Sequence, residues 1–145
     1  MMINRFIYEN SVSYQGYLII PYVLAIANDI PIYSYKLLSE LGHKGNFHLE
    51  ENPTGFYTNS IEKIIKVAQS HLYENSDVKS HGDYFKLRYV YNDDLIIIHQ
   101  KADKFFYDHY KPDSLTNVAA PKIFQSEYEC INWVKAGLDQ AKTKG

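Results

Sequence analysis

The feature that most constrains the fold is an amphipathic helix pattern that occurs twice, each time after runs of aromatic and β-branched residues. Ser60 is placed to cap a first helix that extends to about Leu72, with apolar residues recurring at helical spacing. A second pattern runs from about Ser126 to Asp139. An offset of 66 residues, from Ser60 to Ser126, superposes the two patterns cap for cap.

Strand patterns precede both helices. Residues 16 to 38 predict a hairpin that turns at Asn28 and Asp29, because these residue types tolerate the positive φ of tight hairpin turns. Pro21 and Pro31 lie inside the two runs and cannot donate to a ladder, so part of this hairpin is expected to be an edge or a bulge. Residues 83 to 91, and two further runs that end at Tyr110, predict a second meander.

The repeated order indicates an internal duplication. An offset of 67 pairs Tyr17 with Tyr84, close to the offset that superposes the helices. The alternative is that any two units of hairpin and helix look alike under a loose alignment. We expect a single α+β domain over residues 1–145, built from two βββα-like units at about 3–75 and 80–142. Its β-meanders are antiparallel, and both helices pack on one sheet face.

Composition excludes several classes of protein. At 145 residues, with 46% hydrophobic residues, the chain needs no disulfide or metal to hold a core. Fifteen basic and seventeen acidic residues give a net charge of -2, which argues against wholesale coating of nucleic acid. The longest apolar run is shorter than the roughly 18 to 20 residues of a membrane span, so we expect no membrane contact. The lone Cys130 fits a reducing compartment, and we expect a cytoplasmic protein.

Aromatic content is high, because the chain is tyrosine-rich, with 14 Tyr in an aromatic share of 15%. Most of these rings fall inside strand patterns, where aromatic residues are favoured. The composition therefore supports a β-rich domain more than it supports any particular activity.

Histidines offer two candidate chemical sites. His43 and His48 share a glycine-rich loop with Glu50 and Glu51, which are ligand types that zinc accepts, although this spacing fixes no geometry. Solvent-facing loop histidines are the alternative.

The other candidate site is a pair of strand histidines, His99 and His109, with Asp108 as a carboxylate able to orient an imidazole as a general base. A turn at Ala102 and Asp103 places the two imidazoles on opposite faces of the sheet, whereas a turn longer by one residue places them on the same face. Satisfied core histidines are the alternative. No catalytic serine or cysteine signature accompanies the pair, and we expect Cys130 to be a core residue.

Two surfaces are candidates for binding. Tyr84, Lys86 and Arg88 alternate on one strand face and combine an aromatic ring with two cations, as in sheets that bind single-stranded nucleic acid. Trp133 and the equivalent Val67 lie off the main stripe of each helix. They either pack between adjacent helices or under a loop, or they anchor self-association, because tryptophan is enriched at binding hot spots.

We expect a non-catalytic binding or regulatory protein that self-associates as a homodimer or binds a protein partner. The glycines match no phosphate-binding loop, so no cofactor is expected. The alternatives are single-stranded nucleic-acid binding and a small histidine-carboxylate hydrolase or metal-dependent enzyme.

Overall fold

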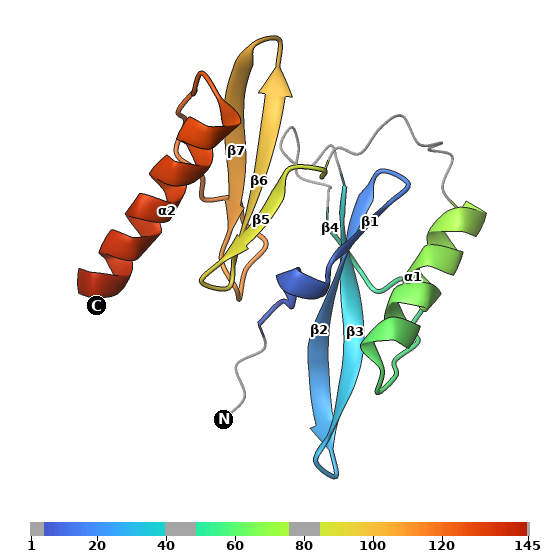
Figure 1. Ribbon diagram of the computed structural model, residues 1–145. Helices are drawn as coiled ribbons and strands as arrows, with labels where there is room; N and C mark the ends of the chain where they lie inside the picture. The colour runs from blue at the N-terminus through green and yellow to red at the C-terminus, as the bar shows by residue number, and fades with distance from the viewer. Residues whose placement is uncertain (1–4, 40–48, 76–84, 145) are drawn as a thin grey trace.

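Two antiparallel sheets form the centre of the computed structural model, which describes residues 5–39, 49–75 and 85–144 (Figure 1). The first sheet has the strand order β1 (Val12–Tyr14), β2 (Tyr17–Ala27), β3 (Ile30–Ser39) and β4 (Leu49–Glu51). The second has the order β5 (Arg88–Tyr91), β6 (Asp94–Lys101) and β7 (Lys104–Tyr110). The helices are α1 (Ile61–Asn75), α2 (Glu127–Lys144) and a short 3-10 helix, η1 (Tyr8–Asn10). The predicted α+β class is confirmed.

The elements form four layers in the order α1, first sheet, second sheet and α2 (Figure 1). Three apolar clusters fill the spaces between adjacent layers. The inner cluster joins the two sheets and contains Phe6, Tyr8, Leu18, Ile20, Tyr22, Leu38, Phe85, Leu95, Ile97, Tyr110 and Leu115. One outer cluster joins the first sheet to α1, and the other joins the second sheet to α2.

This layering corrects the expectation that both helices pack on one face of one sheet. Each sheet buries both of its faces, one against the other sheet and one against its own helix. The cause is visible in β2 and β6, where apolar residues are consecutive and do not alternate with polar ones: Leu18-Ile19-Ile20 and Leu95-Ile96-Ile97 are fully buried. Such continuous runs are typical of strands that are covered on both sides.

The β2–β3 hairpin turns where the sequence predicts it. Asn28 and Asp29 both adopt positive φ, at 54° and 67°. A register shift between Val23 and Ala25 marks a β-bulge, so the predicted irregularity of this hairpin is also confirmed. The hairpin extends beyond the remainder of the first sheet (Figure 1).

Both helices begin at the predicted serines. The Ser60 hydroxyl accepts a hydrogen bond from the Lys63 amide at 3.2 Å, and the Ser126 hydroxyl accepts one from the Glu129 amide at 3.1 Å. The second helix continues to Lys144, five residues beyond the predicted end. The described part of the chain contains no helix that is long and apolar enough to cross a membrane.

The N-terminal segment connects the first sheet to the second half of the chain. The Phe6 amide donates to the Pro112 carbonyl at 2.7 Å, and the Tyr8 hydroxyl donates to the Lys111 carbonyl at 2.6 Å. Phe6 also bridges to Tyr22 of β2. The segment therefore lies against both halves, and Tyr8 is only 1% exposed.

Candidate functional site

The register of β6 and β7 places the two strand histidines on opposite faces of the second sheet. Lys101 lies opposite Lys104, which sets His99 opposite Phe106 and His109 opposite Ile96. Of the two registers that the sequence left open, the structure has the one in which the imidazoles do not meet. Each histidine instead has its own carboxylate partner.

The inner pair lies on the same face of the second sheet as Leu95, Ile97 and Tyr110. The Nε2 atom of His99 is 3.0 Å from Oδ2 of Asp108, and both residues are at most 5% exposed. Asp108 also accepts hydrogen bonds from the Tyr110 hydroxyl at 3.4 Å and the Asn117 amide at 2.9 Å. A buried carboxylate with these partners is fully engaged. We interpret this pair as a structural link.

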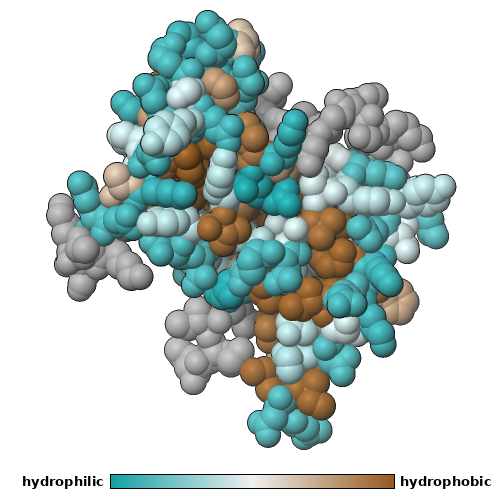
Figure 2. All heavy atoms as spheres, in the orientation of Figure 1, coloured by the Kyte–Doolittle hydropathy of each residue, from teal (hydrophilic) through white to brown (hydrophobic). Residues whose placement is uncertain are grey.

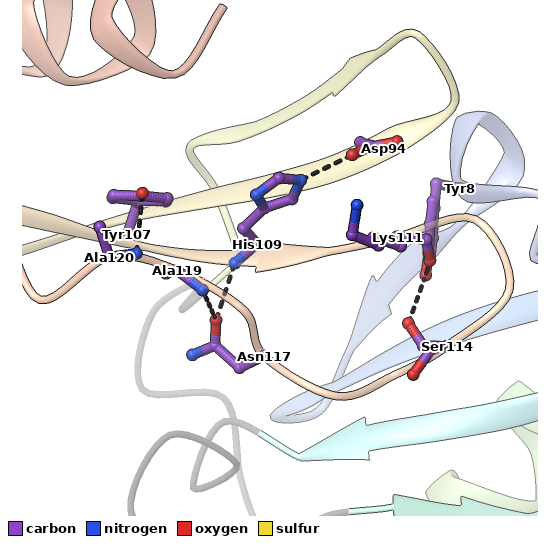
Figure 3. A network of polar contacts seen from close by, with 9 residues as sticks. All are labelled: Tyr8, Asp94, Tyr107, His109, Lys111, Ser114, Asn117, Ala119 and Ala120. Atoms are coloured by element: carbon purple, nitrogen blue, oxygen red, sulfur yellow. Dashed lines mark hydrogen bonds and ion pairs between the residues drawn. The ribbon is translucent and has the colours of Figure 1, made fainter. Parts of the chain in front are cut away.

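The outer pair faces α2 and is more accessible. Nε2 of His109 is 2.6 Å from Oδ2 of Asp94 (Figure 3). Asp94 also borders an open cavity of about 540 Å³. Asn92, Asp93, Lys111 and Leu138 complete the described lining. A histidine held by a carboxylate resembles a general base, but these lining side chains include no hydroxyl or thiol nucleophile.

Asn117 anchors the segment between β7 and α2 (Figure 3). Its side-chain oxygen accepts hydrogen bonds from the amides of His109 and Ala119, and its amide group donates to Asp108. The sequence analysis missed both Asn117 and Asp94. Their signal is weak, because a single Asn in a loop and an Asp after a turn are common, and only the register shows what they contact.

The predicted nucleic-acid surface lies only partly within the described residues. Tyr84 lies outside them, and Lys86 is exposed ahead of β5, which begins at Arg88. The Arg88 guanidinium donates to the main-chain carbonyls of Phe85 at 2.8 Å and Ser11 at 3.5 Å. This cation therefore binds the backbone of both halves.

The predicted metal ligands fall at the edge of the described structure. His43 and His48 lie outside the described residues, and Glu50 and Glu51 belong to β4 within a region predicted to be loop. Among the residues that the structure describes, no group of three or more metal-ligating side chains occurs.

Trp133 packs under the segment that precedes its helix. Its ring centroid is 5.7 Å from that of Phe124 and 6.3 Å from that of Tyr107, and the Lys122 ammonium lies 5.5 Å from the Trp133 centroid. Nearly half of the Trp133 side chain is exposed. Val67 contacts the cluster beneath α1, and because the helices cover different sheets, the two residues do not pack between adjacent helices.

An apolar surface that the sequence analysis overlooked covers the distal part of the β2–β3 hairpin. Leu24, Ile26 and Ile30 are 39%, 48% and 47% exposed. Figure 2 shows hydrophobic surface continuing along the projecting lower part of the molecule and ending in a hydrophilic tip. The sequence indicates this surface only by its low charge density, since Asp29 is the one charged residue between Tyr22 and Tyr35.

Several titratable groups have environments that favour their neutral forms, among them Tyr8, Tyr89 and Cys130. Burial raises the pKa of Tyr8, and the Asp94 charge raises it further. The hydrogen bond from the Tyr89 hydroxyl to Glu127 raises the pKa of Tyr89 to about 12. Burial raises the pKa of Cys130 to about 11, which confirms its prediction as a core residue and makes it a poor nucleophile.

No protein-family model matches the chain, and no curated protein or solved structure matches it either. The candidate surfaces are therefore supported by sequence and geometry alone. Of these, the exposed hairpin departs most from what a folded monomer normally presents to water.

Proposed function

We propose that this chain is a non-catalytic binding protein that self-associates through the distal part of the β2–β3 hairpin, residues 22–35. The observation that carries the proposal is the exposure of Leu24, Ile26 and Ile30 on one projecting element. The register places Ile26 and Ile30 on opposite faces of this two-stranded ribbon, and exposed apolar surface commonly marks a protein interaction site.

The backbone of the hairpin supports the same proposal. Beyond Tyr22, where Phe6 bridges to β2, and Tyr33, where Thr58 bridges to β3, the described structure provides no third strand. A two-stranded ribbon is marginally stable in water, and an exposed edge without lysine is a template for further strand pairing. Residues 23–27 of β2 contain no charge that would oppose such pairing.

Charge favours a second copy of the chain over a lipid surface. Membrane-binding elements usually add basic residues to their apolar ones, because cytoplasmic lipid surfaces are negative. The single charge of this hairpin is the acidic Asp29. Antiparallel pairing of β2 with β2 of a second copy forms a two-fold dimer in which the exposed β2 edge of each copy is paired.

Sedimentation velocity tests the proposal. We expect a dimer for the natural chain and a monomer for Ile26→Lys, because pairing would bury the lysine. Ile123→Lys is the matched control, since Ile123 is 65% exposed on the loop before α2, and this variant is expected to remain a dimer. A natural chain that stays monomeric at about 0.5 mM contradicts the proposal. So does hairpin-dependent binding to lipid vesicles without dimerisation.

The alternative functions have weaker support. Single-stranded nucleic-acid binding needs free cations beside stacked rings, whereas Arg88 is hydrogen-bonded to main-chain carbonyls. A hydrolase needs a free imidazole nitrogen that faces the substrate, whereas Nε2 of His109 is 2.6 Å from Oδ2 of Asp94. A cytoplasmic location remains part of the proposal, supported by the single buried Cys130.

We also propose that the halves arose by duplication, with a strand alignment different from the one expected. β2 corresponds to β6 at an offset of 77, so that Leu18 and Leu95 occupy the same place in the inner core. β3 corresponds to β7 at an offset of 72, which equates Tyr35 with Tyr107. The expected offset of 67 equates β2 with β5, which is the first strand of its meander.

The segments between the last strand and the helix support duplication independently. Thr58 bridges to Tyr33 two residues before the Ser60 cap, and Phe124 bridges to Phe105 two residues before the Ser126 cap. Each segment also contains an asparagine whose side-chain oxygen accepts the amide hydrogen two residues later. These residues are Asn52 and Asn117.

A further inference from the structure

The two halves differ at one equivalent position on the helices. An offset of 66 residues relates Val67 of α1 to Trp133 of α2, because both helices begin one residue after their capping serines. In the second half, the Trp133 ring covers the space between α2 and the preceding segment, against Phe124 and Lys122. The comparison depends on matching positions and not on how the halves arose.

In the first half the corresponding place is a groove. It has a volume of about 410 Å³ and lies between the segment before α1 and the helix itself. Thr54 and Phe56 form one side, and Lys66, Val67, Ser70, His71 and Glu74 form the other. Phe56 is 66% exposed and takes the position that Lys122 has in the second half, so a ring here is able to pack against a second ring.

We propose that this groove binds a free planar aromatic compound of about the size of indole. The second half supports this proposal, because the indole ring of the Trp133 side chain occupies the equivalent place there. The volume falls within the range of small-molecule sites, which combine apolar walls with a few polar groups. Val67 and Phe56 are the apolar walls, and the polar groups are Thr54 before α1 and four side chains of α1 itself.

The charged side chains at the rim of the groove are balanced in sign. Lys66 and Glu74 lie one helical turn to either side of Ser70, so the rim presents one cation and one anion. Neither sign of charge on the ligand is favoured by this pair, and ring shape is the main determinant of binding. A neutral aromatic probe is therefore the appropriate test, and indole itself matches the Trp133 side chain.

The experiment is a titration of the natural chain with indole, followed by backbone amide shifts in NMR spectra. We expect saturable shifts at Phe56, Val67 and His71, with a dissociation constant of about 1 mM or below, as ligand efficiencies of very small ligands allow. Val67→Trp fills the groove from within and should weaken binding at least tenfold. Tyr128→Trp is the matched control, because it adds a tryptophan at a 76% exposed position of α2 that does not line the groove, and it should change the affinity less than threefold.

The reciprocal variant, Trp133→Val, should open a second site. We expect the stoichiometry to rise from one indole to two, with new shifts at Lys122 and Phe124. Absence of saturable shifts up to about 10 mM indole contradicts the proposal, as does unchanged binding by Val67→Trp. If Trp133→Val fails to fold, Val67→Trp and its control Tyr128→Trp still decide the question. Cyclohexanol should bind more weakly than indole, and equal binding would show that no aromatic site is present.

This inference is independent of self-association. The groove beside α1 and the hairpin tip share no residue. Val67→Trp should therefore leave the sedimentation coefficient unchanged while removing the indole shifts, so failure of one proposal is distinguishable from failure of the other.

Discussion

The two halves of the molecule use the same strand register to bury very different residues. On the outer face, Leu37 of β3 is apolar and fully buried, whereas the equivalent His109 of β7 binds Asp94. On the inner face, Tyr22 of the first half corresponds to His99 of the second. One meander thus accepts either apolar residues or ionisable residues, provided that each ionisable group has a partner.

The contact between the first strand and the helix shows the same contrast. In the first half, Val12 and Ile61 both pack against the cluster under α1. In the second half, the equivalent residues are Tyr89 and Glu127, which form a hydrogen bond. An apolar contact in one half therefore corresponds to a titratable contact in the other.

The largest expected effect comes from breaking the inner pair of the second half. Asp108→Ala leaves His99 and Asn117 without their carboxylate, so we expect a loss of about 3 kcal/mol in the free energy of unfolding, measured with urea. The double variant His99→Phe with Asp108→Leu replaces the buried pair by apolar side chains. It should recover most of the loss, and a loss below about 1 kcal/mol for Asp108→Ala would show that the pair is not a structural link.

A smaller effect tests the equivalence of the helix starts. Ser60→Ala and Ser126→Ala each remove one capping hydrogen bond, and each should cost about 1 kcal/mol in urea unfolding. If the halves are equivalent, the two losses agree within about 0.5 kcal/mol. Ser60→Asp and Ser126→Asp are the controls, because aspartate also caps helices and should preserve the stability.

The smallest effect concerns the titratable contact. Because the folded pKa of Tyr89 is about 12 and its ordinary value is 10.0, the hydrogen bond to Glu127 stabilises the fold below pH 10 and loses this contribution as the pH rises towards 12. Tyr89→Phe should cost about 1 kcal/mol at pH 8 and almost nothing at pH 12. The cost of Val12→Ala, at the equivalent apolar contact, should not depend on pH over this range. A cost of Tyr89→Phe that is equally independent of pH would contradict the assignment.

Local features were predictable from the sequence because they depend on neighbouring residues. The turn at Asn28 and Asp29 and the caps at Ser60 and Ser126 each need only a few residues to specify them. The α+β class followed from the same local patterns. The four layers did not, because they depend on how the two sheets and their helices stack, and only the continuous apolar runs in β2 and β6 indicate burial on both faces.

The candidate sites were less predictable because they depend on register and on exposure. His109 contacts Asp94 across the sheet, and the adjacent Asp108 contacts His99 instead, an exchange that only the strand pairing reveals. The exposure of the hairpin and of the groove at Val67 depends on which other segments of the chain lie against them in the folded structure. Sequence periodicity carries no such information.

The position of the N-terminal segment has a consequence for synthesis. Tyr8 is hydrogen-bonded to Lys111, a contact that spans 103 residues of chain, and it completes the inner core shared by both sheets. On the ribosome the first sheet emerges long before its covering partner, so its inner face stays exposed until the second meander is made. The chain therefore reaches its native state late in translation, and fragments of either half should aggregate where the whole chain folds.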